Sequence, residues 1–152
     1  KELGFGQAVV DGVHRSETLQ RAHRVLQQSK MLSSKYHVVV ANPPYLGADA
    51  NEAVKAYLRD AFPEGKTDLF AAFILRGLDL ALAAGLVGMI TMHSWMFLKT
   101  FQNLRQRVLQ ETQIITMAHL GTRAFDSIGG EVVATTAFVL ENGCCERPVP
   151  PC

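Results

Sequence analysis

The sequence has no cysteine outside its last nine residues, no long hydrophobic run and no clear excess of charge of one sign. Its three cysteines, Cys144, Cys145 and Cys152, lack the spacing of a zinc site and suit a reducing cytoplasm. The apolar stretch at residues 78–92 is interrupted by two glycines and is shorter than the roughly 18 apolar residues of a membrane span. These absences argue against a disulfide-stabilised secreted protein, a zinc-stabilised module and a membrane protein.

The sequence also lacks an initiator methionine, a signal peptide and a glycine-rich cofactor loop. It begins at Lys1. A glycine-rich cofactor loop follows a strand, whereas no strand is predicted before Gly4-Phe5-Gly6. We therefore expect residues 1–15 to be a flexible lead-in and the chain to be a fragment of a longer protein. With 15 basic and 14 acidic residues, the chain has no basic excess that would hold nucleic acid well by itself.

What is present is one stretch around which the chain is organised. Residues 36–41 read Tyr-His-Val-Val-Val-Ala, which predicts a strand buried on both faces in the middle of a parallel sheet. The strand stops at Asn42-Pro43-Pro44-Tyr45, because proline has no N–H for the ladder and restricts the residue before it. Asn42 is therefore expected at the carboxyl end of a central strand, where open α/β sheets bind ligands. The alternative is a purely structural turn stiffened by its prolines.

Hydrophobic spacing predicts an α/β domain around this strand, since 152 residues with 48% hydrophobic content suffice for a packed core. An amphipathic helix is expected to begin at Ser16 and to pack ahead of the strand. The remaining predicted elements are helices at residues 52–61, 68–84 and 100–111 and strands at residues 86–92, 114–120 and 132–140. No helix-length segment separates the last two strands, so the last strand must return antiparallel.

Local signals define the ends of the long apolar helix and the rim beside it. Thr67 is expected to cap the helix at residues 68–84, with Asp68 in its first turn and Gly85 at its end. His93-Ser94-Trp95 follows the strand at residues 86–92 and is expected on the same rim as Asn42. We interpret His93 as a residue that shapes this rim, and Ser94 and Trp95 as positioning and packing residues.

The motif Asn42-Pro43-Pro44-Tyr45 after a strand resembles that of the amino-methyltransferases that use S-adenosylmethionine. The amino-acid sequence at residues 38–47 and 130–140 is similar to that of the adenine-N6 DNA methyltransferases of restriction and phage-defence systems, in particular those of the BREX type. The resemblance covers residues 36–142. It implies the C-terminal part of a Rossmann-like class I methyltransferase sheet, mostly parallel with an antiparallel end hairpin, and a glycine-rich cofactor loop upstream of this chain.

The resemblance also implies roles for single residues. The expected catalytic residues are Asn42, Pro43, Pro44 and Tyr45. Tyr45 and Phe125 are expected against the target base, and the residues expected to bind S-adenosylmethionine are Asn42, Asp68, Phe70 and Phe73, with Phe73 preferred to Phe70 for the adenine ring of the cofactor. For Phe70 and Phe73, ordinary core packing is the alternative. No metal site is expected.

These residue types suit methyl transfer to an exocyclic amine, whose lone pair is delocalised into the ring. The side-chain carbonyl of Asn42 and the backbone carbonyl of Pro43 can accept the two hydrogens of the amine and free that lone pair. Tyr45 offers a face for a base that has left the duplex. The expected reaction is methylation of adenine N6 in DNA by a cytoplasmic enzyme, with DNA and other subunits of a defence or restriction complex as partners of the complete protein.

Two other functions stay open. A protein glutamine-N5 methyltransferase, which acts on a protein such as a release factor, uses the same motif on a planar amide. A catalytically silent methyltransferase-like module would instead bind a partner in a larger defence complex. In each case we expect residues 1–35 to form the lead-in and amphipathic helix, residues 36–142 the catalytic half of the methyltransferase domain, and residues 143–152 a disordered tail.

Overall fold

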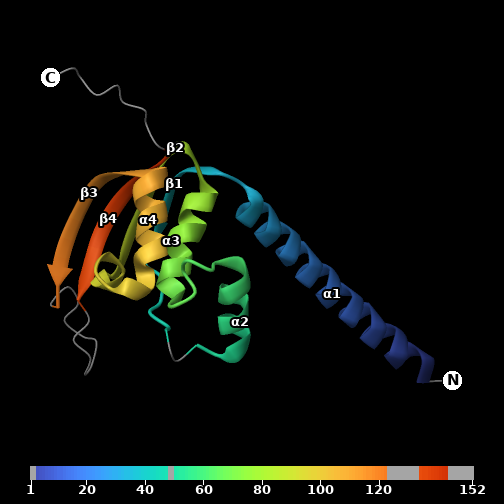
Figure 1. The fold of residues 1–152 in the computed structure, drawn as a ribbon. Helices are drawn as coiled ribbons and strands as arrows, with labels where there is room; N and C mark the ends of the chain where they lie inside the picture. Colours follow the sequence, from blue (N-terminus) through green and yellow to red (C-terminus); the bar gives the residue numbers. More distant parts are fainter. Residues whose placement is uncertain (1–2, 48–49, 123–133, 144–152) are drawn as a thin grey trace, which may run out of the picture. The chain divides into compact units, whose positions relative to one another are not determined.

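The computed structural model describes residues 3–47, 50–122 and 134–143, with side chains from Ser16 onward. The chain divides into two units, Lys1–Ser34 and Lys35–Cys152. The first unit is a single helix, α1, at Leu3–Ser33, which Figure 1 colours blue. The hydroxyls of Ser33 and Ser34 donate to the carbonyl of Lys30 at its last turn.

This helix differs from the sequence-based expectation at its start and in its pattern. It begins at Leu3 instead of Ser16, so the prediction of a flexible lead-in at residues 1–15 is wrong from Leu3 onward. Apolar and polar residues are spread around the whole helix, which makes the expected amphipathic face weak. No helix in the described ranges has both the length and the apolar character needed to cross a membrane.

The second unit contains a four-stranded sheet in the order β1-β2-β4-β3. The strands are β1 at Tyr36–Ala41, β2 at Ala81–Met92, β3 at Thr112–Gly121 and β4 at Thr135–Asn142. β1 pairs parallel with β2, and β4 pairs antiparallel with both β2 and β3. Three strands thus run in one direction and β4 returns between two of them, which confirms the α/β fold with an antiparallel end hairpin.

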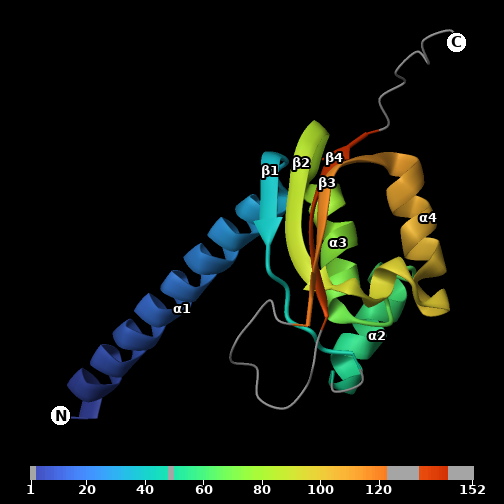
Figure 2. The same ribbon diagram turned by 90° about the vertical axis from the view of Figure 1, so that its left-hand side faces the viewer.

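The helices of this unit are α2 at Glu52–Ala61, α3 at Leu69–Leu80 and α4 at Gln102–Glu111, with short 3₁₀ turns at His93–Met96 and Lys99–Phe101. Figure 2 shows α3 and α4 on the same side of the sheet. The core fills the space between these two helices and the sheet. Its fully buried members include Phe70, Ile74, Leu75, Val87, Leu104, Val108, Phe138 and Leu140.

The position of β1 differs from the prediction of a strand buried on both faces. β1 pairs only with β2 among the described strands, so it forms an edge of this sheet. Val39 packs against the core, whereas Val38 and Val40 on the other face are 57% and 77% exposed. The apolar run therefore forms a strand with one face on the core. Its other face and its free edge are not covered by the described part of this unit.

The long apolar helix also begins and ends differently from the prediction. Asp68, not Thr67, is the N-cap, because its side chain accepts from the backbone N–H of Phe70. α3 ends at Leu80 instead of continuing to residue 84, and the amide of Asn142 on β4 donates to the carbonyls of Leu78, Ala81 and Leu82 there. These partners lie about 60 residues apart in sequence, which is why local patterns did not place the helix end.

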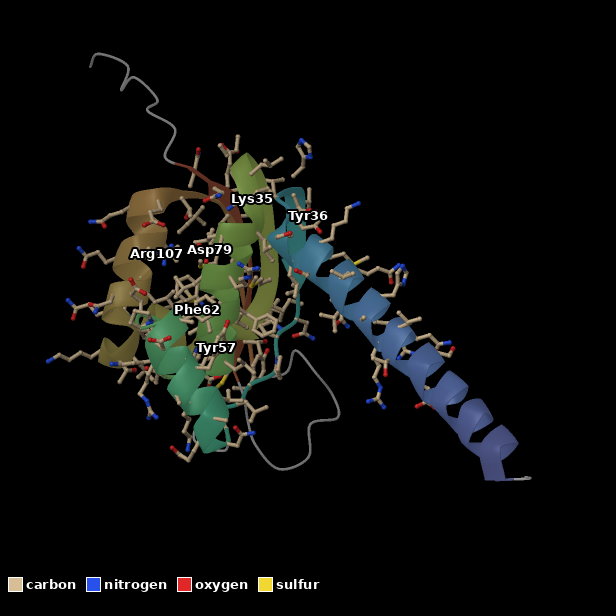
Figure 3. The ribbon with its side chains drawn as sticks, turned by 90° about the vertical axis from the view of Figure 1, so that its right-hand side faces the viewer. Lys35, Tyr36, Tyr57, Phe62, Asp79 and Arg107 are labelled. Atoms are coloured by element: carbon tan, nitrogen blue, oxygen red, sulfur yellow. The ribbon has the colours of Figure 1, made fainter. Side chains whose placement is uncertain are left out.

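One ion pair outside the core joins α3 and α4, and a second lies within α4. Arg107 on α4 contacts Asp79 on α3 at 3.5 Å and Glu111 at 3.0 Å, and Figure 3 labels Arg107 and Asp79 between these helices. The charge of its partners raises the pKa of Arg107 against the opposing effect of burial. The pairs are partly exposed, so each contributes modestly to stability.

Candidate active site

The Asn-Pro-Pro-Tyr segment leaves the sheet at the carboxyl end of β1. Ala41, the last residue of β1, pairs with Met89 on β2. Asn42 therefore follows β1 at the same end of the sheet at which β2 passes into His93. Asn42 is exposed and Pro43 is buried. The exposed side-chain amide of Asn42 therefore lies at the end of β1, and the next residue, Pro43, is fixed by its burial.

Asn42 borders a shallow hollow of about 460 Å³ on the sheet. Its lining includes small residues, Gly88 on β2, Ala118 on β3 and Ala137 on β4, together with the larger Ile90 and Val139. Val40, which lines it as well, is largely exposed, so the hollow lies on the sheet face that α3 and α4 leave uncovered. A flat partner or an apolar side chain could rest there.

Tyr45 points toward the helix layer. Its ring lies edge-on to that of Phe70, with centroids 6.2 Å apart and planes at 88°. Its hydroxyl is buried and has no hydrogen-bond partner among the described residues, and this burial raises the pKa of Tyr45. The ring is half-buried, so one part of it packs on the core while the rest stays open.

Asp68 ties the Asn-Pro-Pro-Tyr segment to the start of α3. One carboxylate oxygen accepts from the backbone N–H of Leu46 at 3.1 Å and from that of Phe70 at 3.3 Å. Burial raises the pKa of Asp68, while the backbone hydrogen bonds from Leu46, Phe70 and Leu69 act in the opposite direction. A Cβ on Gly47 would lie 2.9 Å from the other carboxylate oxygen, so a larger residue at this position would require the Asp68 carboxylate to shift.

The two aromatic candidates on α3 lie in different surroundings. Phe70 is fully buried, between the rings of Tyr45 and Phe101. Phe73 is 39% exposed and lines a pocket of about 170 Å³ with Tyr57, Phe62 and Arg76 among others. Tyr57 and Phe62 lie edge-on with centroids 6.0 Å apart, and both are labelled on or beside α2 in Figure 3.

The rim after β2 contains a pair that the sequence analysis did not find. Nδ1 of His93 lies 2.8 Å from Nε2 of His119 on β3. The two residues are 26 positions apart, and only the expectation that both strands end at one edge could have suggested the pair. Trp95 is buried, donates to the Thr91 hydroxyl and packs edge-on against Phe138, as expected of a packing residue. Phe125 lies outside the described residues.

Known proteins share this combination of sequence and fold. Residues 9–125 match the family described as "Eco57I restriction-modification methylase". The chain is 41% identical over 136 residues to the "Adenine-specific methyltransferase BrxX" of Escherichia coli O9:H4 (strain HS), covering 89% of this chain and 11% of that protein. It is 48% identical over 119 residues to the "Adenine-specific methyltransferase PglX" of Lacticaseibacillus casei (strain Zhang), covering 78% and 10%. The chain thus spans about a tenth of the length of these relatives.

Solved structures share the fold at lower identity. A putative class I S-adenosylmethionine-dependent methyltransferase from Listeria monocytogenes matches 79% of this chain and 35% of its own, with a TM-score of 0.56 and 18% identity. A cryo-electron microscopy structure of a DrdV–DNA complex matches 78% of this chain and 14% of its own, with a TM-score of 0.59 and 16% identity. From the family match over most of its length and the shared class I methyltransferase fold, the chain belongs to the Eco57I restriction-modification methylase family.

Proposed function

We propose that the longer protein to which this chain belongs transfers a methyl group from S-adenosylmethionine to the N6 amine of an adenine flipped out of DNA. The observation that carries this proposal is the position of Asn42-Pro43-Pro44-Tyr45 at the carboxyl end of β1, at the border of the sheet hollow. Membership of a methylase family and relatives named adenine-specific methyltransferases support adenine as the target.

Asn42 and Pro43 are proposed to hold the amine. The side-chain oxygen of Asn42 and the carbonyl oxygen of Pro43 would each accept one hydrogen of the amine, which makes the nitrogen lone pair available for attack. Pro44 restricts the backbone of Pro43, and the buried ring of Pro43 anchors the segment. The acceptors are therefore fixed before the substrate arrives, which is the condition for an electrostatic contribution to catalysis.

Tyr45 and Phe125 are proposed to hold the flipped base. The exposed part of the Tyr45 ring would stack on the base, a contact worth roughly 1–3 kcal/mol. The edge-on packing of Tyr45 on Phe70 supports a fixed ring orientation. Phe125 is proposed to close the other side of the base.

Phe73 is proposed to pack on the adenine ring of the cofactor, which supplies a methyl group activated on a sulfonium. Its partly exposed ring and the aromatic pocket of about 170 Å³ fit a flat apolar ring. Phe70 is proposed to support the site without contacting the cofactor, since it is fully buried and packs against Tyr45. Asp68 is proposed to position the motif and the cofactor pocket through its bonds to Leu46 and Phe70.

The rest of the longer protein is proposed to complete the site. β1 has an open edge where further parallel strands with the glycine-rich loop would pair, and the chain covers only 35% of the Listeria methyltransferase. DNA would be held mainly by those other parts, since this chain has a net charge of only +1. The DNA complex of DrdV and the relatives named adenine-specific methyltransferases support DNA as a partner. Other subunits of a defence or restriction complex are proposed as further partners.

The test offers unmethylated DNA and a release-factor protein, side by side, to the longer protein with radiolabelled S-adenosylmethionine. We expect label in DNA as N6-methyladenine and a loss of roughly 100-fold or more in Asn42→Ala. The unfolding midpoint should not change, because Asn42 is an exposed strand tip. Asn103→Ala, which removes an exposed amide from α4, is the matched control and should keep full activity.

The other outcomes separate the alternatives. Label in the release factor would overturn the DNA proposal in favour of a glutamine methyltransferase. Label in neither substrate, with a folded protein, would favour a silent module. Unfolding of Asn42→Ala would contradict the assignment of Asn42 to the site.

A further inference from the structure

The geometry points to a site for a divalent transition metal of the Ni²⁺ or Cu²⁺ type, which we propose is formed by His93 and His119. The two imidazole nitrogens, Nδ1 of His93 and Nε2 of His119, face each other at 2.8 Å. Imidazole nitrogen is a preferred ligand of these ions. The site is independent of the proposed methyl transfer, which requires no metal.

Without metal, the separation of the two nitrogens is that of a hydrogen bond. Metal–nitrogen bonds of about 2.0–2.1 Å place two ligands about 2.9 Å apart at a right angle and about 3.3 Å apart at a tetrahedral angle. The observed 2.8 Å is close to the right angle. Neighbouring positions of a square-planar or octahedral ion have this angle, so the nitrogens move less to bind Ni²⁺ or Cu²⁺ than to bind tetrahedral Zn²⁺.

Both rings are held in place by backbone and side-chain contacts. The N–H of His93 donates to the carbonyl of Ala134 at 3.0 Å, and the edge-on ring of Phe97 lies 5.4 Å from the His93 ring. His119 belongs to β3 and is in register with Thr136 on β4. Their rings are close to parallel, at 25°. A rotation of the two rings is therefore enough to turn both nitrogens from each other toward one ion.

The site is open to the solvent that must supply the remaining ligands. His93 is half-buried and His119 is exposed. No group of three or more histidine, cysteine or carboxylate side chains gathers as a metal site within residues 16–47, 50–122 and 134–143. The pair therefore supplies two ligands, and water occupies the other positions.

Binding requires a change of tautomer but no net loss of a proton from the neutral pair. Without metal, one of the facing nitrogens donates a hydrogen to the other. When the ion binds, that proton moves to the remote nitrogen of the same ring, and both facing lone pairs bind the metal.

The test titrates the 152-residue chain with NiCl₂ by calorimetry, in a background with Cys144→Ser, Cys145→Ser and Cys152→Ser because thiolates bind the same ions. We expect one Ni²⁺ per chain, a raised unfolding midpoint, and no response to Mg²⁺. His93→Gln, His93→Ala and His119→Ala should each weaken binding at least about tenfold. The double variant should lose little more than either single one, because both rings bind one ion.

Matched controls and a spectroscopic signature separate this site from adventitious binding. His23→Ala and His37→Ala remove exposed imidazoles elsewhere and should leave binding unchanged. With Cu²⁺, electron paramagnetic resonance should show coupling to two nitrogens in the parent and fewer in His93→Gln. Absence of Ni²⁺ binding in the folded parent, or equal weakening by His23→Ala and His93→Gln, would overturn the proposal.

Discussion

Asp68 shows how one side chain can connect a motif to the fold. Its carboxylate caps α3 and at the same time accepts the N–H of Leu46, directly after the Asn-Pro-Pro-Tyr segment. Gly47 leaves room for the second carboxylate oxygen. The start of α3 and the position of Tyr45 are therefore coupled through one residue.

Replacing Asp68 tests this coupling. Asp68→Ala should lower the free energy of unfolding by about 1 kcal/mol or more, as expected for the loss of an N-cap. Asp68→Asn keeps an acceptor and should lose less. Urea unfolding of the 152-residue chain measures both, and equal stability of Asp68→Ala and the parent would contradict the capping role.

The pH dependence of the same variants has a defined sign. Because burial raises the pKa of Asp68, the folded state binds this proton more tightly than the unfolded state. The contribution of the group to stability therefore falls as the pH rises through and above the ordinary carboxyl range. Unfolding measured from acidic to neutral pH should show Asp68→Asn gaining stability relative to the parent, and the opposite trend would contradict this assignment.

At the scale of elements, the end of α3 depends on β4. Asn142 donates to three carbonyls at and just beyond the C-terminus of α3, those of Leu78, Ala81 and Leu82. The Leu78 carbonyl also accepts from the backbone N–H of Ala81. β4 in turn pairs with both β2 and β3. One amide thus joins the helix layer to the centre of the sheet.

Asn142→Ala should lower the free energy of unfolding by about 1–3 kcal/mol, because partly buried carbonyls lose their donor. Asn103→Ala on the exposed face of α4 serves as the control and should change stability by less than about 0.5 kcal/mol. Chemical denaturation followed by circular dichroism distinguishes them. Equal effects of the two variants would show that Asn142 does not cap α3.

At the scale of the whole molecule, the sheet has an apolar face that this unit leaves open. Val40 is 77% exposed beside the hollow whose lining includes Gly88, Ala118 and Ala137. Exposed apolar patches of this kind usually mark contact surfaces. The chain spans about a tenth of the length of its relatives, and we propose that other parts of the longer protein cover this face.

Val40→Lys should therefore act differently in the short and the long chain. In the 152-residue chain it should change the free energy of unfolding by less than about 0.5 kcal/mol, because the side chain is exposed. In the longer protein it should cost at least about 2 kcal/mol, since a charge would be buried. Leu109→Lys on α4 is the exposed control, and equal effects of Val40→Lys in both chains would contradict burial of this face.

Binding of S-adenosylmethionine should also depend on parts of the longer protein outside this chain. We expect the 152-residue chain to bind S-adenosylmethionine weakly or not at all, because the strands and glycine-rich loop proposed to complete the pocket lie outside it. Calorimetry checks this directly, and micromolar affinity of the short chain would contradict it. Phe73→Ala in the longer protein should weaken cofactor binding, whereas the exposed control Leu109→Ala should not.

The sequence by itself determined the features that depend on neighbouring residues. The apolar run at residues 36–41, the prolines after it and the spacing of Phe70, Ile74 and Leu78 predict strand, tip and helix locally, and the structure contains all three. The return of β4 also followed from the sequence, because the segment between the last two strands is too short for a crossover helix.

Only the tertiary structure decided the features that join distant parts of the chain. The capping of α3 by Asn142, the pairing of His93 with His119 and the burial of Phe70 but not Phe73 depend on which strands become neighbours. β1 illustrates the difference best. Its composition is that of a central strand, yet it lies at an edge here, because hydrophobic composition records what a strand is built to contact and not which partners are present.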